Sequence, residues 1–147
     1  MLLLLINGQK YKKIDIEKIM KEKKILFINL CKGRLGEENS SFLGAMFITK
    51  IKQAGMARAS MPEENRTDFY LYVDEFHNLV TETFENILSE ARKYCLCLTV
   101  AHQYVGQLTP RVQAAVLGNT GTIIIFRVGG EDAVKLEPEM NPVFNVK

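Results

Sequence analysis

Four short apolar runs, separated by stretches of helical character, constrain the fold of this chain more than any other feature. The run at residues 25–30 is almost continuously apolar, which is typical of a strand buried on both faces of a parallel sheet. Three further runs with strand character follow at residues 69–73, 96–101 and 121–126. Strands that alternate with helices predict an α/β domain with a mostly parallel sheet flanked by helices. In such sheets, ligands bind beyond the carboxyl ends of the strands.

The intervening stretches carry apolar residues at three- and four-residue spacing, which is the pattern of an amphipathic helix. We expect Thr81 to cap one of these helices, whose first turn is acidic and whose last turn is basic. A proline-containing loop is expected at residues 62–65. The other helices are expected at residues 14–24, 37–59 and 110–117 and from residue 131 to residue 136.

The length and composition favour one domain that spans residues 1–147. A chain of 147 residues, 47% of them hydrophobic, can bury one core and is too short for two ordinary domains. The 19 basic and 17 acidic residues leave a net charge of +2, which excludes a broad nucleic-acid-binding surface. Any contact with DNA must therefore be local.

The cysteines and the first residues bear on where the chain works. Cys31, Cys95 and Cys97 have neither the spacing of a zinc ribbon nor that of a disulfide framework, which favours a reducing compartment. Residues 1–6 are apolar but too few to cross a bilayer, and no basic segment precedes them. We therefore expect a cytoplasmic location and no membrane contact from this segment.

Two adjacent carboxylates, Asp74 and Glu75, directly follow the apolar run at residues 69–73. This arrangement has the form of a Walker B motif. An Mg²⁺ ion on the phosphates of a nucleotide needs hard oxygen ligands, which Asp74 can supply directly or through water. Glu75 can then orient and deprotonate the attacking water. The alternative is an acidic strand end that only begins a turn.

Four ordered motifs give the sequence a more specific resemblance. The motifs are Tyr-Val-Asp-Glu-Phe-His-Asn at 72–78, Leu-Ser-Glu-Ala-Arg-Lys-Tyr at 88–94, Ala-His-Gln-Tyr at 101–104 and Gly-Asn-Thr-Gly-Thr-Ile-Ile-Ile-Phe-Arg at 118–127. Together they resemble the C-terminal ATPase region of conjugative DNA-transfer coupling proteins of the TraG/TraD type, in type IV secretion, and of their HerA/FtsK-like P-loop ATPase relatives. The resemblance covers nearly the whole chain and implies the C-terminal part of a RecA-like core.

The resemblance implies roles for individual residues. Asp74 and Glu75 are then the Walker B pair that binds Mg²⁺ and ATP, and Gln103 matches the family's sensor of the γ-phosphate. Arg92 matches the arginine finger that enters the neighbouring subunit's site, where a planar guanidinium stabilises the transferring phosphoryl group. Alternatively, Arg92 only offsets a helix dipole. Arg127 is a second candidate for the finger, because it leaves the last expected strand near the same sheet edge, or it is simply a solvated strand end.

The phosphate-binding loop of this family is missing from the sequence. No Gly-x-x-x-x-Gly-Lys-Ser/Thr occurs, so Asp74 can hold little of a nucleotide and hydrolysis by this chain alone should be negligible. Cys95 also departs from the family, which commonly has glycine at this turn. We interpret the chain as a fragment of a parent ATPase or the product of a split gene. The alternative is a catalytically inert ATPase-like subunit or contact module.

For the parent protein, the resemblance implies a ring-forming motor, expected to be a homo-hexamer, that couples ATP hydrolysis to the movement of DNA. It also implies secretion-channel or relaxosome proteins as partners, and a place at the inner face of the cell membrane through a segment outside this chain. Lys32 and Arg34 are candidates for contact with the DNA backbone. Two basic residues are weak evidence for such a contact, and a solvated loop is the preferred interpretation.

A metal-dependent hydrolase is the rival interpretation from another class. His77 and His102 follow expected strand ends and, with Asp74 and Glu75, supply four groups that bind transition metals. However, the sequence lacks the helical His-Glu-x-x-His spacing that is typical of such enzymes. We therefore rank the metal site below the nucleotide site.

Overall fold

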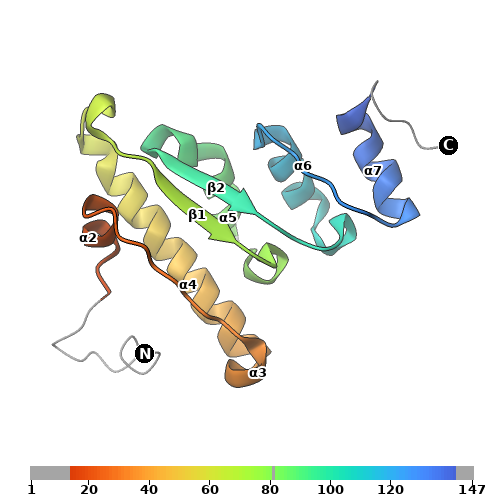
Figure 1. Ribbon diagram of the computed structural model, residues 1–147, viewed down its shortest axis with the longest axis horizontal. Coiled ribbons are helices and arrows are strands. Elements are labelled where there is room, and N and C mark those ends of the chain that lie inside the picture. The colour runs from red at the N-terminus through yellow and green to blue at the C-terminus, as the bar shows by residue number, and fades with distance from the viewer. Residues whose placement is uncertain (1–13, 81, 142–147) are drawn as a thin grey trace.

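The computed structural model describes residues 14–80 and 82–141, in which helices alternate with strands (Figure 1). This content agrees with the predicted α/β class. The helices are α2 (Ile16–Lys21), α3 (Lys32–Leu35), α4 (Glu37–Met56), α5 (Glu82–Glu90), α6 (Pro110–Asn119) and α7 (Gly130–Met140), and the strands are β1 (Phe69–Val73) and β2 (Leu96–Val100). Short 3-10 turns, η1 to η5, lie at Ala57–Ser60, Glu63–Asn65, Phe76–Leu79, Ala91–Tyr94 and Val105–Gln107.

Strands β1 and β2 form a parallel pair, in a register that runs from Phe69 opposite Leu96 to Val73 opposite Val100. Backbone hydrogen bonds extend the pairing beyond both ends of the ladder. The Phe69 amide donates to the Cys95 carbonyl at 2.8 Å, and the Ala101 amide donates to the Val73 carbonyl at 2.9 Å. The carboxyl ends of both strands therefore meet at one edge of the sheet.

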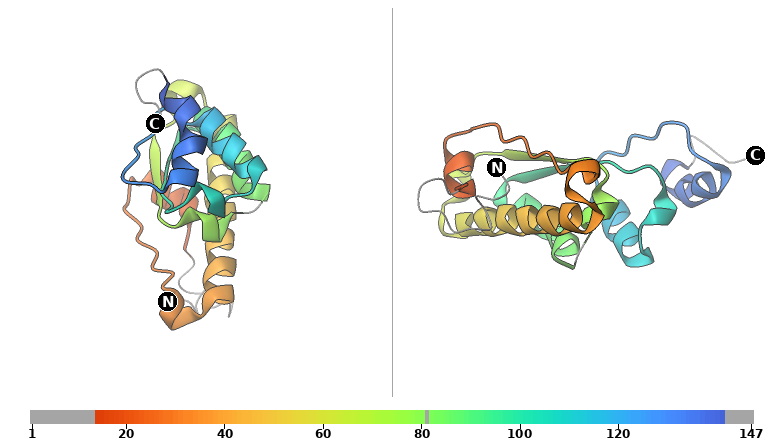
Figure 2. Two further views of the ribbon diagram at one scale, coloured as in Figure 1. Left: turned by 90° about the vertical axis from the view of Figure 1, so that its right-hand side faces the viewer. Right: turned by 90° about the horizontal axis from the view of Figure 1, so that it is seen from below.

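The core lies between the strand pair and the two helices α4 and α5, which cover the same side of the sheet (Figures 1 and 2). Phe76 and Phe84 are fully buried at its centre, and their rings stack with centroids 5.4 Å apart. On the other side of β1, Tyr70 and Tyr72 are exposed by 60% and 72%. The other buried members of the core are Ile16, Met20, Ile48, Ile51, Ala54, Val73, Ile87, Ala91, Leu96, Leu108 and Val112.

Two of the four predicted strands are not formed. Residues 25–30 and 121–126 have no regular secondary structure. Phe27 and Phe126 are exposed by 85% and 86%, which contradicts burial on both faces. An apolar run becomes a buried strand only where other strands offer it hydrogen bonds and layers cover both its faces. In the described part of the chain the sheet has two strands, so the larger RecA-like sheet stays a prediction.

The predicted helices are formed, with shifted ends. Asp15 caps α2 through a 2.9 Å hydrogen bond from the Lys18 amide, and α6 begins at Pro110 after its cap Thr109. The long helix predicted at 37–59 ends as α4 at Met56 and continues as the turn η1. The solvated loop considered for Lys32 and Arg34 is instead the short helix α3, followed by Gly36 at a φ of 77°.

Two predictions lie outside the described residues, namely the helix cap at Thr81 and the apolar run at residues 1–6. Among the helices described in 14–80 and 82–141, none is both long and apolar enough to cross a membrane.

Gly44 lets α4 pack closely on the neighbouring segments. A Cβ atom at this position would lie 2.2 Å from Leu79 Cδ2 and 3.1 Å from Leu30 Cδ1. At Gly55, in the same helix, the nearest atom to such a Cβ would be Leu96 Cδ2 at 3.8 Å, an ordinary contact. The two glycines therefore differ only in the space around them.

We expect Gly44→Ala to destabilise the protein by about 1–3 kcal/mol, because the added methyl overpacks the α4 interface. Gly55→Ala is the matched control and should leave the stability unchanged or raise it by up to about 1 kcal/mol through helix propensity. Urea denaturation followed by circular dichroism measures both. Equal stabilities for the two variants would show that the close packing at Gly44 does not matter.

Candidate functional site

The predicted site residues Asp74 and Glu75 lie in the turn that follows β1. Asp74 Oδ1 accepts a 3.0 Å hydrogen bond from the Glu75 amide, and the Asp74 side chain is exposed. The next amide, that of Phe76, donates to the Ala101 carbonyl at 3.0 Å, which ties the turn to the residue after β2. The Phe76 side chain is fully buried and therefore anchors the turn to the core.

Glu75 has a left-handed backbone conformation, with a φ of 49° and a ψ of 41°. For a residue with a side chain this conformation costs about 1–2 kcal/mol. Two donors hold its carbonyl, since the Asn78 amide lies at 3.0 Å and Asn78 Nδ2 at 3.2 Å from the oxygen. Strained residues of this kind cluster at functional sites, where the surrounding contacts maintain them.

Gln103 reaches the same carboxylate from the segment after β2. Its Nε2 donates to Glu75 Oε1 at 2.5 Å, although the two residues are 28 positions apart in the sequence. The parallel pairing of β1 and β2 produces this convergence, because it places both strand ends at one edge. The structure therefore brings together three of the residues that the sequence singled out: Asp74, Glu75 and Gln103.

His77 approaches the other oxygen of the same carboxylate. Its Nδ1 lies 3.4 Å from Glu75 Oε2, a distance that makes an ion pair when the imidazole is protonated. The Nδ1 atom is buried and makes no hydrogen bond within the described residues. The contact is therefore electrostatic in character and depends on the charge of the imidazole.

His102 lies beneath the turn, with its ring edge-on to Phe76 at a centroid distance of 5.1 Å. Burial lowers the pKa of His102, and the neighbouring His77 lowers it further, while Asp132 and Glu75 oppose the shift. His102 is therefore neutral at pH 7. Among the described residues, no three His, Cys, Asp or Glu side chains converge in a way that could hold a metal ion. The rival transition-metal centre of Asp74, Glu75, His77 and His102 is thus not formed.

Lys32 is bound into this region rather than free in a solvated loop. Its Nζ donates to Asn78 Oδ1 at 2.7 Å and to Glu37 Oε1 at 3.0 Å. Arg34, two residues later in α3, is exposed, and its side chain makes no hydrogen bond or ion pair with the described residues. A contact of either residue with DNA stays a prediction, and for Lys32 it would compete with these two bonds.

The two predicted arginine fingers lie away from the carboxylates of their own chain. Arg92 is exposed in η4, which directly precedes β2, so it lies at the amino end of the sheet. Asp74, Glu75 and Gln103 lie at the opposite, carboxyl edge of the sheet, which we call the Asp74 edge. A five-residue strand separates the two ends by about 16 Å at 3.3 Å per residue. Arg127 is exposed on the irregular segment between α6 and α7, and the strand on which its prediction relied is absent.

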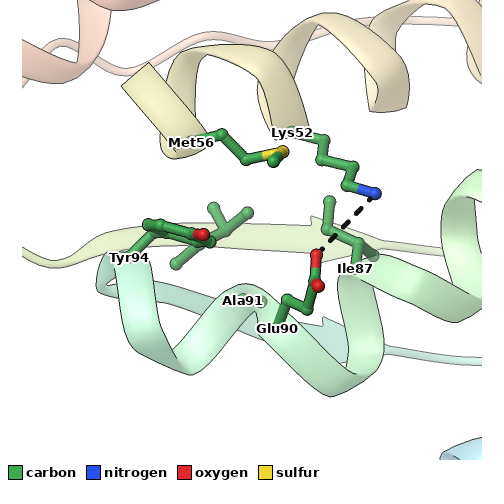
Figure 3. A pocket seen from close by; sticks show the side chains of 8 residues that line it. Lys52, Met56, Ile87, Glu90, Ala91 and Tyr94 are labelled. Carbon is green, nitrogen blue, oxygen red and sulfur yellow. Dashed lines mark ion pairs between the residues drawn. The ribbon is translucent and has the colours of Figure 1, made fainter. Parts of the chain in front are cut away.

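The site is an open edge rather than a closed pocket. A small depression elsewhere, between α4 and the end of α5, holds about 10 Å³, room for about one water molecule (Figure 3). Across it, Lys52 Nζ and Glu90 Oε2 form an ion pair at 3.9 Å, and Met56 and Tyr94 face one another. A nucleotide does not fit in this depression, which leaves the Asp74 edge as the candidate site.

The sequence reasoning missed two residues that shape this edge. Asn78 bonds both to the Glu75 turn and to Lys32. Asp132 is 7% exposed and accepts the Val105 amide at 3.0 Å, which ties α7 to the segment that follows Gln103. Asn78 lies in the motif at 72–78, but its pairing with Lys32 spans 46 residues and leaves no local pattern.

Comparison with known proteins places the site within a family. Residues 68–136 match the family model described as the TraM recognition site of TraD and TraG. The matched span begins one residue before β1 and ends within α7, so it contains Asp74, Glu75, Arg92, Gln103 and Arg127. No curated protein and no solved structure matches the chain.

Proposed function

We propose that the Asp74 edge forms part of an ATP site in a conjugative coupling protein, because residues 68–136 match the family model of a TraD and TraG region. The convergence of Glu75 and Gln103 beside Asp74, at the carboxyl end of two parallel strands, carries this proposal. Open α/β sheets bind ligands at this position. The family match and the site geometry both fit a coupling protein that uses ATP.

The residues of the edge suit the distinct tasks of phosphoryl transfer to water. Asp74 uses one oxygen for the Glu75 amide and keeps an exposed carboxylate for Mg²⁺, which when bound neutralises charge on the phosphates. Glu75 can orient a water molecule and accept its proton. Gln103 holds Glu75 in place through Nε2 and keeps its amide oxygen available for a neighbouring donor.

The site needs a phosphate-binding loop that this sequence does not contain. Another polypeptide segment must supply the amides, the lysine and the hydroxyl that hold the phosphates. In the assembled coupling protein we propose a homo-hexameric ring that moves DNA. Arg92 would then serve the neighbouring subunit, because it lies at the opposite end of the sheet from Asp74. Relaxosome and secretion-channel proteins are the proposed partners.

A second candidate function is a contact module without catalysis. The family model is described as a TraM recognition site, so residues 68–136 would bind a TraM-like relaxosome protein. The missing phosphate-binding loop favours this function for the chain acting alone. Binding to TraM with no response to nucleotide would support the contact module over the ATP site.

Nucleotide binding by the whole chain tests the ATP site. In an NMR titration with Mg²⁺ and the slowly hydrolysed analogue ATPγS, we expect shifts at Asp74, Glu75 and Gln103. The affinity should be weak, roughly millimolar, because no phosphate-binding loop is present. Asp74→Asn should abolish the Mg²⁺-dependent shifts, since it removes the anionic ligand.

Asp68→Asn is the matched control for this titration. Asp68 is also an exposed aspartate, but it precedes β1 and lies at the opposite end of the strand. The Asp68→Asn variant should bind Mg²⁺ and ATPγS like the unaltered chain. If neither the unaltered chain nor Asp68→Asn responds at up to about ten times the expected dissociation constant, the proposal that this edge binds nucleotide is wrong, and TraM binding then decides whether the chain is a contact module.

A further inference from the structure

Asn78 connects the Glu75 turn to the start of α4. Its Nδ2 donates to the Glu75 carbonyl at 3.2 Å, and its Oδ1 accepts from Lys32 Nζ at 2.7 Å. Lys32 Nζ also donates to Glu37 Oε1 at 3.0 Å, in the first turn of α4. A continuous chain of polar contacts therefore runs from α3 and α4 to the backbone of Glu75.

Lys32 determines which way the Asn78 amide faces. An ammonium group has donors only, so the side-chain oxygen of Asn78 must point toward Lys32. This orientation turns the amide N–H groups toward the Glu75 carbonyl. A carbonyl oxygen cannot accept from another oxygen acceptor, so a flipped amide would lose both bonds at once. The Lys32 contact thus supports the Asn78 contact to Glu75.

The contacts of Lys32 and Asn78 maintain the backbone conformation of Glu75. Glu75 has a positive φ of 49°, which residues with side chains adopt rarely. From this backbone its carboxylate reaches Gln103 Nε2 and lies beside His77. If the turn relaxed to an ordinary right-handed or extended conformation, the direction of the side chain would change. The carboxylate position therefore depends on the two donors at the Glu75 carbonyl.

We propose that Lys32 and Asn78 are positioning residues that hold Glu75 in its left-handed conformation and aim its carboxylate at Gln103. The consequence for catalysis rests on the proposed ATP site, but the positioning itself does not. Movement of α3, which carries Lys32, would then alter the position of the Glu75 carboxylate. Lys32 acts in this way within the site, in place of its predicted contact with DNA.

The Lys32–Glu37 contact does not contribute to the positioning of Glu75. Glu37 is 75% exposed and Lys32 is 44% exposed, and ion pairs at such exposure contribute little because solvent screens them. Asn78, by contrast, is half-buried and bonds to backbone that is itself tied to the core. Glu37→Gln is therefore the matched control, since it changes a Lys32 partner without touching Asn78.

NMR spectroscopy of the full chain tests the proposal without nucleotide. In the unaltered protein we expect NOEs between the Gln103 side-chain amide and Glu75 Hγ, and the strong intraresidue amide-to-Hα NOE of a positive φ at Glu75. Lys32→Met and Asn78→Asp should lose both signals. An aspartate side chain at 78 can still accept from Lys32 but cannot donate to the Glu75 carbonyl, which then keeps only the backbone amide of residue 78 as a donor.

Three comparisons decide the outcome. Lys32→Arg should keep both signals because it keeps the donor, and Glu37→Gln should keep them as well. If Lys32→Met and Asn78→Asp fold with both signals intact, Lys32 and Asn78 do not position Glu75. If either variant unfolds, the signals of the other variant and of Lys32→Arg decide the question. Absence of ATPγS binding would leave this result untouched, so the positioning and the ATP site fail separately.

Discussion

Phe76→Ala is expected to destabilise the protein by about 3–5 kcal/mol and to leave much of it unfolded. Phe76 is fully buried, stacks on Phe84 and contacts the edge of His102. Truncation removes the apolar contacts of a whole ring and leaves a cavity that the surroundings fill only in part. Domains of this size are stable by about 5–15 kcal/mol, so this loss is a large fraction of the total.

Urea denaturation followed by circular dichroism measures the effect, and Phe126→Ala is the control. Phe126 is 86% exposed, so its truncation should change the free energy of unfolding by less than about 0.5 kcal/mol. Phe76→Leu should have an intermediate effect, because it keeps part of the apolar volume. Equal stabilities of Phe76→Ala and Phe126→Ala would contradict the core described here.

Phe76→Ala should also change the site in the molecules that stay folded. Phe76 directly follows Glu75, and its ring anchors the turn from the core side. Without the ring, the turn loses the contact that holds it against the core. We therefore expect the NOEs between Gln103 and Glu75 to weaken together with the stability.

Arg58→Ala is expected to cost about 2–3 kcal/mol, which is the second largest effect. Arg58 lies in η1, is 8% exposed and donates through Nη1 to the Thr67 carbonyl at 2.8 Å and the Tyr94 carbonyl at 3.3 Å. These carbonyls belong to the segments that lead into β1 and β2. Removal of the guanidinium leaves both without their charged donor and also removes buried side-chain packing.

Arg127→Ala is the control for Arg58→Ala, because Arg127 is exposed and makes no side-chain hydrogen bond within the described residues. Its stability should match that of the unaltered chain within about 0.5 kcal/mol. Arg58 lies at the amino end of the sheet, so the NOEs between Gln103 and Glu75 should persist in Arg58→Ala. Loss of those NOEs, or a stability equal to that of Arg127→Ala, would contradict this assignment.

The sequence predicted the elements of the site well, because their patterns are local. The apolar run that ends in Asp74 and Glu75 forms β1, and the run before Gln103 forms β2. Alternation with helices implied parallel strands, and parallel strands place Glu75 and Gln103 at one edge. The family motifs over these residues agree with the match at 68–136.

The same reasoning failed where a prediction needed knowledge of neighbours. Residues 25–30 and 121–126 are as apolar as β1, but in the described structure no strand pairs with them. Ile25 and Ile124 are therefore exposed by 83% and 76%. An apolar run reports the tendency to be buried in a sheet, and it does not report whether a partner strand is available.

By itself, the sequence determined the helices, the two strands that border the site and the chemical groups at their ends, because these depend on residues close together in the chain. Only the tertiary structure decided the left-handed turn at Glu75 and its link through Asn78 to Lys32. That link joins residues 46 positions apart, and it forms only when α3 lies close to the turn η3 that follows β1. Such contacts arise from the packing of whole elements, and no spacing along the chain encodes them.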